Sequence, residues 1–133
     1  MLTEFKPGHY LAFEISDKSR AHLLTMFPAQ FSKIIAHHVT IEFNLTAEKF
    51  DNYKRLFTDQ TEVRVYGYAK GDGIECVAVS IGDEYKRADG SFYHVTLSLE
   101  PPHKPVESNL LENKVVSIAT TFTLDGVFKL IKK

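Results

Sequence analysis

The amino-acid sequence predicts an α+β fold of two similar lobes, with sheets that are mostly antiparallel. Most apolar residues alternate with polar ones, which is the period of half-buried strands, and short turns separate these segments. Two other segments follow residues that commonly cap helix N-termini. Residues 38–43 recur in character as residues 94–99, so one type of strand occurs twice. Two copies fit a pseudo-symmetric pair of lobes that face each other across a cleft.

The first part of the chain is predicted to form a strand and a short helix. Residues 8–15 alternate between apolar and polar or smaller side chains and are predicted to be a strand. Ser16 or Asp17 then caps a helix over residues 18–26. Residues 29–36 are predicted to connect this helix to the next strand without forming an element.

The middle of the chain is predicted to contain three strands and the second helix. Residues 38–43 form the first copy of the repeated strand. Thr46 is a favourable N-cap, and the aromatic residues of segment 48–57 are spaced by three and four, so they share one helix face. Segments 61–69 and 74–81 flank a tight turn that contains two glycines, and they are predicted to pair as a hairpin.

The last part of the chain is predicted to complete the second lobe. A polar segment, 82–91, precedes the second copy of the repeated strand at 94–99. Residues 100–113 contain three prolines and are predicted to be irregular. Segments 115–123 and 127–131 flank an Asp-Gly pair and are predicted to pair as a closing hairpin. The sequence therefore predicts about seven strands and two helices.

Both copies of the repeated strand have one apolar and one polar face, because successive side chains point to opposite sides of a sheet. The apolar faces are predicted to carry Val39, Ile41, Phe43, Val95, Leu97 and Leu99. The polar faces are predicted to carry His38, Thr40, Glu42, His94, Thr96 and Ser98. Each polar face thus presents an imidazole and a hydroxyl that are two positions apart.

This pattern of histidine and threonine is suited to phosphodiester chemistry. Two imidazoles can act as general base and general acid, because an ordinary histidine pKa of about 6.5 makes both protonation states accessible near neutral pH. Each threonine hydroxyl can donate to a non-bridging phosphate oxygen while the neighbouring imidazole reaches a bridging one. A competing interpretation is a zinc or iron site in which Glu42 joins His38 and His94 as a ligand.

Size and composition restrict the class of protein further. The chain of 133 residues is predicted to be one domain, 1–133, and its net charge of −1 does not provide the basic field that drives non-specific duplex binding. The single cysteine, Cys76, lies in an apolar run and is predicted to be a buried structural thiol. The sequence contains no signal region and no membrane-spanning apolar run, which predicts a cytoplasmic protein, or one of the host cytoplasm if the gene is viral. No stable protein partner is predicted.

Two His-x-Thr strands resemble the signature of the 2H phosphoesterase superfamily, with His38-Val39-Thr40 as the first motif and His94-Val95-Thr96 as the second. Segments 87–93 and 104–109 are similar to those that flank the second motif in one branch of that superfamily. This branch contains the cyclic phosphodiesterase domain of tRNA ligases and the RNA-repair-like proteins of phages and bacteria. The resemblance implies two lobes around a central cleft, helices on the outside and no cofactor.

The resemblance also implies a reaction, namely metal-independent opening of 2′,3′-cyclic phosphates of RNA ends or nucleotides, usually to 2′-phosphates. One of His38 and His94 is then the base and the other the acid, while Thr40 and Thr96 hold phosphate oxygens. The candidates for substrate binding are Tyr10, Lys104, Ser108 and Asn109. Two alternatives remain open: a hydrolase of cyclic oligonucleotide signals, as in phage proteins that remove immune signalling molecules, and a nucleotide-binding module without turnover.

Overall fold

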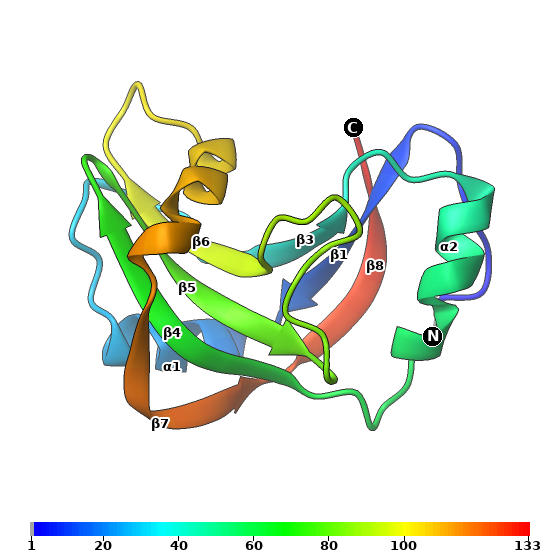
Figure 1. Cartoon of the computed structure of the whole chain (residues 1–133), viewed down its shortest axis with the longest axis horizontal. Helices are drawn as coiled ribbons and strands as arrows, with labels where there is room; N and C mark the ends of the chain where they lie inside the picture. The colour runs from blue at the N-terminus through cyan, green and yellow to red at the C-terminus, as the bar shows by residue number, and fades with distance from the viewer. Residues whose placement is uncertain (1) are drawn as a thin grey trace.

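The computed structural model describes residues 2–133 and confirms the predicted α+β class, with two antiparallel sheets that diverge from each other (Figure 1). Met1, the first residue of the N-terminal stretch predicted to lack a signal region, lies outside the described residues. The smaller sheet has the strand order β3-β1-β8, which are His38–Glu42, His9–Ile15 and Gly126–Lys132. No helix within residues 2–133 is both long and apolar enough to cross a membrane.

The larger sheet has five strands in the order β2-β6-β5-β4-β7. Their bounds are Lys33–Ile34, His94–Leu99, Ile74–Ile81, Val63–Gly71 and Val116–Leu124. β4 and β5 pair antiparallel across a tight turn, which confirms the predicted hairpin. The first motif strand therefore belongs to the smaller sheet and the second to the larger one, with β3 and β6 side by side where the sheets meet (Figure 1).

The two predicted helices are present and begin at the predicted caps. In α1, Asp17–Met26, the Ser16 hydroxyl accepts a hydrogen bond from the Ser19 backbone N–H at 3.1 Å. In α2, Ala47–Tyr53, the Thr46 hydroxyl accepts one from the third residue of the helix. The predicted second helix is shorter as an α-helix, because its last turn tightens into the 3-10 helix η1, Lys54–Leu56.

One large apolar core is shared by both sheets and both α-helices. Val39 and Ile41 of β3 and Val95 and Leu97 of β6 are all fully buried in it. The helices contribute further buried residues: Leu23, Phe50 and Tyr53. A smaller cluster on the other face of the larger sheet contains Cys76, which is fully buried as predicted. Burial raises the pKa of its thiol to about 12, so this thiol stays protonated at neutral pH.

Three predictions about local structure are wrong. The predicted connector at 29–36 contains β2, which adds an eighth strand by pairing with β6. The predicted irregular excursion contains the 3-10 helix η2, Pro105–Lys114, which packs Leu111 into the smaller cluster. β7 and β8 do not form a hairpin: β7 pairs with β4, and β8 pairs with β1 in the other sheet. Alternation predicts that these segments are strands but contains no information about their long-range partners.

Each motif strand contains a β-bulge at the same position. Between β1 and β3 the register steps from Thr40 to Glu42, which leaves Ile41 as the extra residue. Between β5 and β6 the register steps in the same way around Leu97. Both extra residues follow their motif histidine by three positions, which matches the predicted pseudo-two-fold relation between the lobes. An extra residue reverses the facing of every side chain that follows it in the strand.

Because of the bulges, the side chains that follow each motif point to the face opposite the one that regular alternation predicts. Glu42 is buried and accepts a hydrogen bond from the Tyr53 hydroxyl at 3.1 Å. Ser98 is also buried and donates to the carboxylate of Glu75. Phe43 instead is 53% exposed and lines the space between the lobes. Regular alternation therefore predicted the wrong face for four residues: Glu42, Phe43, Ser98 and Leu99.

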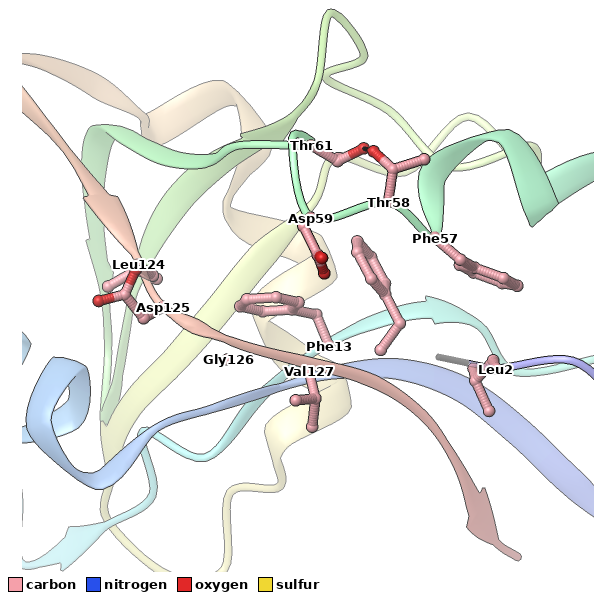
Figure 2. A pocket seen from close by; sticks show the side chains of 11 residues that line it. Leu2, Phe13, Phe57, Thr58, Asp59, Thr61, Leu124, Asp125, Gly126 and Val127 are labelled. Carbon is pink, nitrogen blue, oxygen red and sulfur yellow. Dashed lines mark hydrogen bonds between the residues drawn. The ribbon is translucent and has the colours of Figure 1, made fainter.

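The chain crosses from the larger sheet to the smaller one at Gly126. The Asp125 carbonyl accepts from the Ser16 N–H at 2.8 Å, and the Asp125 N–H donates to the Ser19 hydroxyl at 2.8 Å, which fixes the crossover to the start of α1. Figure 2 shows Leu124, Asp125 and Gly126 running past the ring of Phe13. A Cβ atom at position 126 would lie 2.1 Å from the backbone oxygen of Glu14.

We expect Gly126→Ala to lower the free energy of unfolding by about 2–3 kcal/mol, because backbone atoms would have to move to accept the methyl group. Urea denaturation followed by circular dichroism measures the change. Val127→Ala, at an exposed neighbour, is the matched control and should change stability by less than about 0.5 kcal/mol. Equal stability of the Gly126→Ala protein and the unaltered protein would contradict the crossover geometry.

Candidate active site

A cavity of about 510 Å³ lies between the two lobes and contains both sequence motifs. Its lining comes from β1, β3, β6, η2, the end of the β2 segment and the loop before β6. The lining residues are Tyr10, Ile35, His38, Thr40, Phe43, Arg87, Asp89, His94, Thr96, Pro105, Val106 and Asn109. The structure therefore brings together the two histidines and two threonines, which are far apart in the sequence.

A second cavity, of about 270 Å³, lies at the crossover between β7 and β8 and contains neither motif. It is bordered by Phe13, Asp59 and Asp125, all labelled in Figure 2. None of the residues that the sequence analysis selected as site candidates lines this cavity. The space between the lobes is therefore the candidate active site.

His94 is held as a neutral imidazole with a defined tautomer. Its Nδ1 lies 3.1 Å from the backbone carbonyl oxygen of Phe92. Because a carbonyl only accepts, Nδ1 must carry the proton, and Nε2 keeps a free lone pair. Burial lowers the pKa of His94 to about 4, and the positive charge of Arg87 acts in the same direction. Near neutral pH, His94 therefore has a base form that is ready to accept a proton.

His38 lines the same cavity from β3, in the smaller sheet, and is less deeply buried. Burial lowers its pKa, and the neighbouring His37 lowers it further, whereas the carboxylate of Glu14 raises it. The Tyr10 hydroxyl is 3.5 Å from Nε2 of His38, a long contact. Tyr10 also packs against Phe43, with ring centroids 5.3 Å apart, so an aromatic pair borders the His38 side of the cavity.

Thr96 is held in place by η2, the helix that the sequence did not predict. Its hydroxyl oxygen lies 2.8 Å from the hydroxyl oxygen of Ser108 and 3.3 Å from the carbonyl of Pro105. Ser108 is fully buried behind Thr96 and does not line the cavity. Ser108 is thus placed to orient Thr96 and not to touch a ligand in the cavity.

Arg87 is the principal site residue that sequence reasoning did not select. Its Nε donates to the carbonyl of Thr40 at 3.0 Å, and its Nη1 donates to the side-chain oxygen of Asn109 at 3.3 Å, so it connects the two lobes. It forms none of the ion pairs found among residues 2–133, although it is partly buried. The available signal was an arginine in a polar segment shortly before the second motif.

Two other candidates have different positions. Asn109 lines the cavity and accepts from Arg87. Lys104 does not line it; this residue precedes η2, and its backbone N–H donates to the Glu107 carboxylate at 2.6 Å. Glu42, the third ligand of the competing metal interpretation, is turned into the core. Across the described part of the chain, no three His, Cys, Asp or Glu side chains are grouped so that they could hold a metal ion.

Comparison with known structures agrees with the fold. The crystal structure of a fungal RNA kinase superposes with a TM-score of 0.64 at 14% sequence identity, over 99% of this chain and 47% of that chain. At this identity the similarity establishes the two-lobed α+β fold alone, and the chain spans just under half of the fungal protein. No protein-family model and no curated protein sequence matches the chain.

We expect His94 to titrate near pH 4 in two-dimensional NMR of the imidazole groups, well below the ordinary histidine value of about 6.5. In the unfolded chain this histidine binds its proton at about pH 6.5, so between pH 6.5 and 4 the unfolded state holds more protons than the folded state. Stability should therefore fall as the pH falls through this window. The His94→Gln variant should lose part of this dependence, and an NMR titration near pH 6.5 would contradict the site geometry.

Proposed function

We propose that the protein is a metal-independent phosphodiesterase that opens 2′,3′-cyclic phosphates of RNA ends or nucleotides. The observation that carries this proposal is the single cavity that both His-x-Thr motifs line. Two imidazoles and two hydroxyls around one cavity are what acid–base cleavage of a phosphodiester requires. The similarity in fold to an RNA kinase supports a substrate of the RNA or nucleotide class.

His94 is assigned as the general base and His38 as the general acid. The free Nε2 of His94 takes a proton from water, whose oxygen forms a bond to phosphorus. The bond between phosphorus and O3′ breaks, and O3′ receives a proton from Nε2 of His38, which leaves a 2′-phosphate. A bound phosphate anion raises the pKa of a nearby imidazole, so the substrate itself favours the protonated form of His38.

Arg87 and the two threonines are assigned to the non-bridging phosphate oxygens. A guanidinium that lacks a carboxylate partner and lines the cavity is suited to bind a phosphate, to which it can donate more than one hydrogen bond. Thr40 supplies one hydroxyl donor, and Thr96 supplies a second when its proton turns from the carbonyl of Pro105 to the phosphate. Tyr10 and Asn109 are assigned to the rest of the substrate, and Ser108 to the orientation of Thr96. Lys104 does not line the cavity, and its predicted role is to bind a part of the substrate that extends outside it.

The second candidate function is hydrolysis of a cyclic oligonucleotide signal. The observation that favours it is the cavity volume of about 510 Å³, which falls in the usual range for small-molecule sites and suits a compact nucleotide. A panel of 2′,3′-cyclic mononucleotides, RNA oligonucleotides with cyclic phosphate ends, and cyclic di- and trinucleotides decides between the two. Binding without product from any of these would instead favour the nucleotide-binding module.

We expect turnover of a 2′,3′-cyclic nucleotide in the presence of EDTA, with a bell-shaped dependence of kcat/KM on pH. His38→Ala and His94→Ala should each lower kcat by about a hundred- to ten-thousand-fold, because each removes one proton transfer. Liquid chromatography of the products measures the rate and separates 2′- from 3′-phosphates.

His22→Ala is the matched control for these two variants, because His22 is exposed on α1 and does not line the cavity. This control should keep full activity. Unchanged activity of either His38→Ala or His94→Ala would contradict the proposed mechanism. Loss of activity in EDTA with recovery on adding zinc would instead favour a metal-dependent reaction.

The charge of Arg87 should be visible in the pH profile. Because this charge lowers the pKa of His94, Arg87→Gln should move the acidic limb of the kcat/KM profile to higher pH as well as raise KM. Arg87→Lys keeps the charge but not the bidentate donor geometry. The acidic limb of its kcat/KM profile should therefore lie close to that of the unaltered protein, whereas its KM should stay raised. An acidic limb that stays in place in Arg87→Gln would contradict the assignment of His94 as the base.

A further inference from the structure

A basic cavity adjoins the candidate active site. It has a volume of about 310 Å³ and lies between α2 with η1 and the loop that precedes β6. Its charged lining consists of four cations and one carboxylate: Lys49, Arg55, Lys86, Arg87 and Glu84. Three of these cations are paired with carboxylates: Lys49 with Glu42 at 3.6 Å, Arg55 with Glu84, and Lys86 with Glu112 at 2.9 Å. The four cations and these three carboxylates together leave an excess of one positive charge, although the whole chain has a net charge of −1.

Arg87 lines both this basic cavity and the candidate active site. Within the same loop, Lys86 and Ala88 face the basic cavity, whereas Asp89 faces the active site. Segment 86–89 is thus a narrow ridge with one cavity on each side. The two spaces are therefore neighbours that share one guanidinium, as a substrate with two adjacent phosphates would require.

We propose that the basic cavity binds a second phosphodiester group of the substrate, next to the one that is cleaved. This inference rests on the proposed function and defines its substrate class. The preferred substrate is an oligonucleotide with at least two phosphates, and a cyclic mononucleotide occupies the candidate active site alone. One phosphate lies between His38 and His94, and its neighbour lies over Lys86 and Arg55.

The cations of the basic cavity are accessible to such a ligand. The side chain of Lys86 is 58% exposed and pairs with Glu112 at 2.9 Å, and that of Arg55 is 56% exposed and pairs with Glu84. Exposed ion pairs of this kind contribute at most about 1 kcal/mol. A phosphate can therefore exchange for the carboxylate partner at small cost, or share the cation with it.

The tests compare substrates with one and two phosphates. We expect Lys86→Gln to lower kcat/KM about five- to tenfold for a dinucleotide that ends in a 2′,3′-cyclic phosphate, because one charged hydrogen bond is lost. The same variant should leave kcat/KM of the 2′,3′-cyclic mononucleotide unchanged. The double variant Lys86→Gln/Arg55→Gln should show a larger difference between the two substrates. A cyclic dinucleotide, measured beside them, distinguishes an RNA end from a cyclic signal as the source of the second phosphate.

Salt dependence provides an independent measurement. Each phosphate contact that is lost should make the plot of log affinity against log salt concentration less steep by about 0.7 for a single strand. Lys86→Arg keeps the charge and should restore the slope. Lys18→Gln, which removes an exposed lysine on α1, is the control and should change neither slope nor kcat/KM. Equal effects of Lys86→Gln on both substrates, or no effect on the dinucleotide, would overturn the second phosphate site.

Failure of the proposed reaction is distinguishable from failure of this site. If the unaltered protein turns over neither substrate, the phosphodiesterase proposal fails. Fluorescence anisotropy of a labelled dinucleotide with a 2′-phosphate end then tests the second phosphate site by binding alone, without turnover. Weaker binding to Lys86→Gln than to Lys18→Gln supports the site, and equal binding overturns it.

Discussion

The apolar core that both sheets share determines which way each motif strand faces. Val39 and Ile41 of one strand and Val95 and Leu97 of the other are fully buried in this core. Burying one such side chain stabilises the fold by about 1.5–3 kcal/mol, so a one-residue slip of either strand would cost several kcal/mol. The side chains at the alternate positions must point away from the core. Because the two strands lie side by side, their histidines and threonines enter one cavity.

The matching bulges limit the polar surface that the strands present to this cavity. Without them, Glu42 and Ser98 would follow the histidine and threonine into the space between the lobes. The bulges turn both residues into the protein, where Tyr53 and Glu75 satisfy them, and place the ring of Phe43 at the cavity instead. One carboxylate is thereby kept out of the cavity, which Asp89 still lines, and an apolar surface is added on which the organic part of the proposed substrate can rest.

Arg87 links the structure of the site to its electrostatics. One guanidinium connects the backbone of β3 in the smaller sheet with Asn109 of η2, so it helps to fix the separation of the lobes. The same charge lowers the pKa of His94 and faces two cavities. Within residues 2–133 this guanidinium forms no ion pair, although the carboxylates of Asp89 and Glu42 partly compensate its charge, and burial lowers its pKa. An anionic ligand in contact with it would compensate the charge further.

The sequence by itself determined the α+β class, the helix caps and the pairing of the histidine and threonine within each strand, because alternation and capping are local. Only the tertiary structure decided that β7 and β8 belong to different sheets, that η2 holds Thr96, and that Arg87 lines the same cavity as both motifs. It also decided that Ser108 lies behind the cavity and Lys104 outside it. These features depend on contacts between distant segments, and strand register across a bulge depends on the partner strand, which the pattern of one segment does not encode.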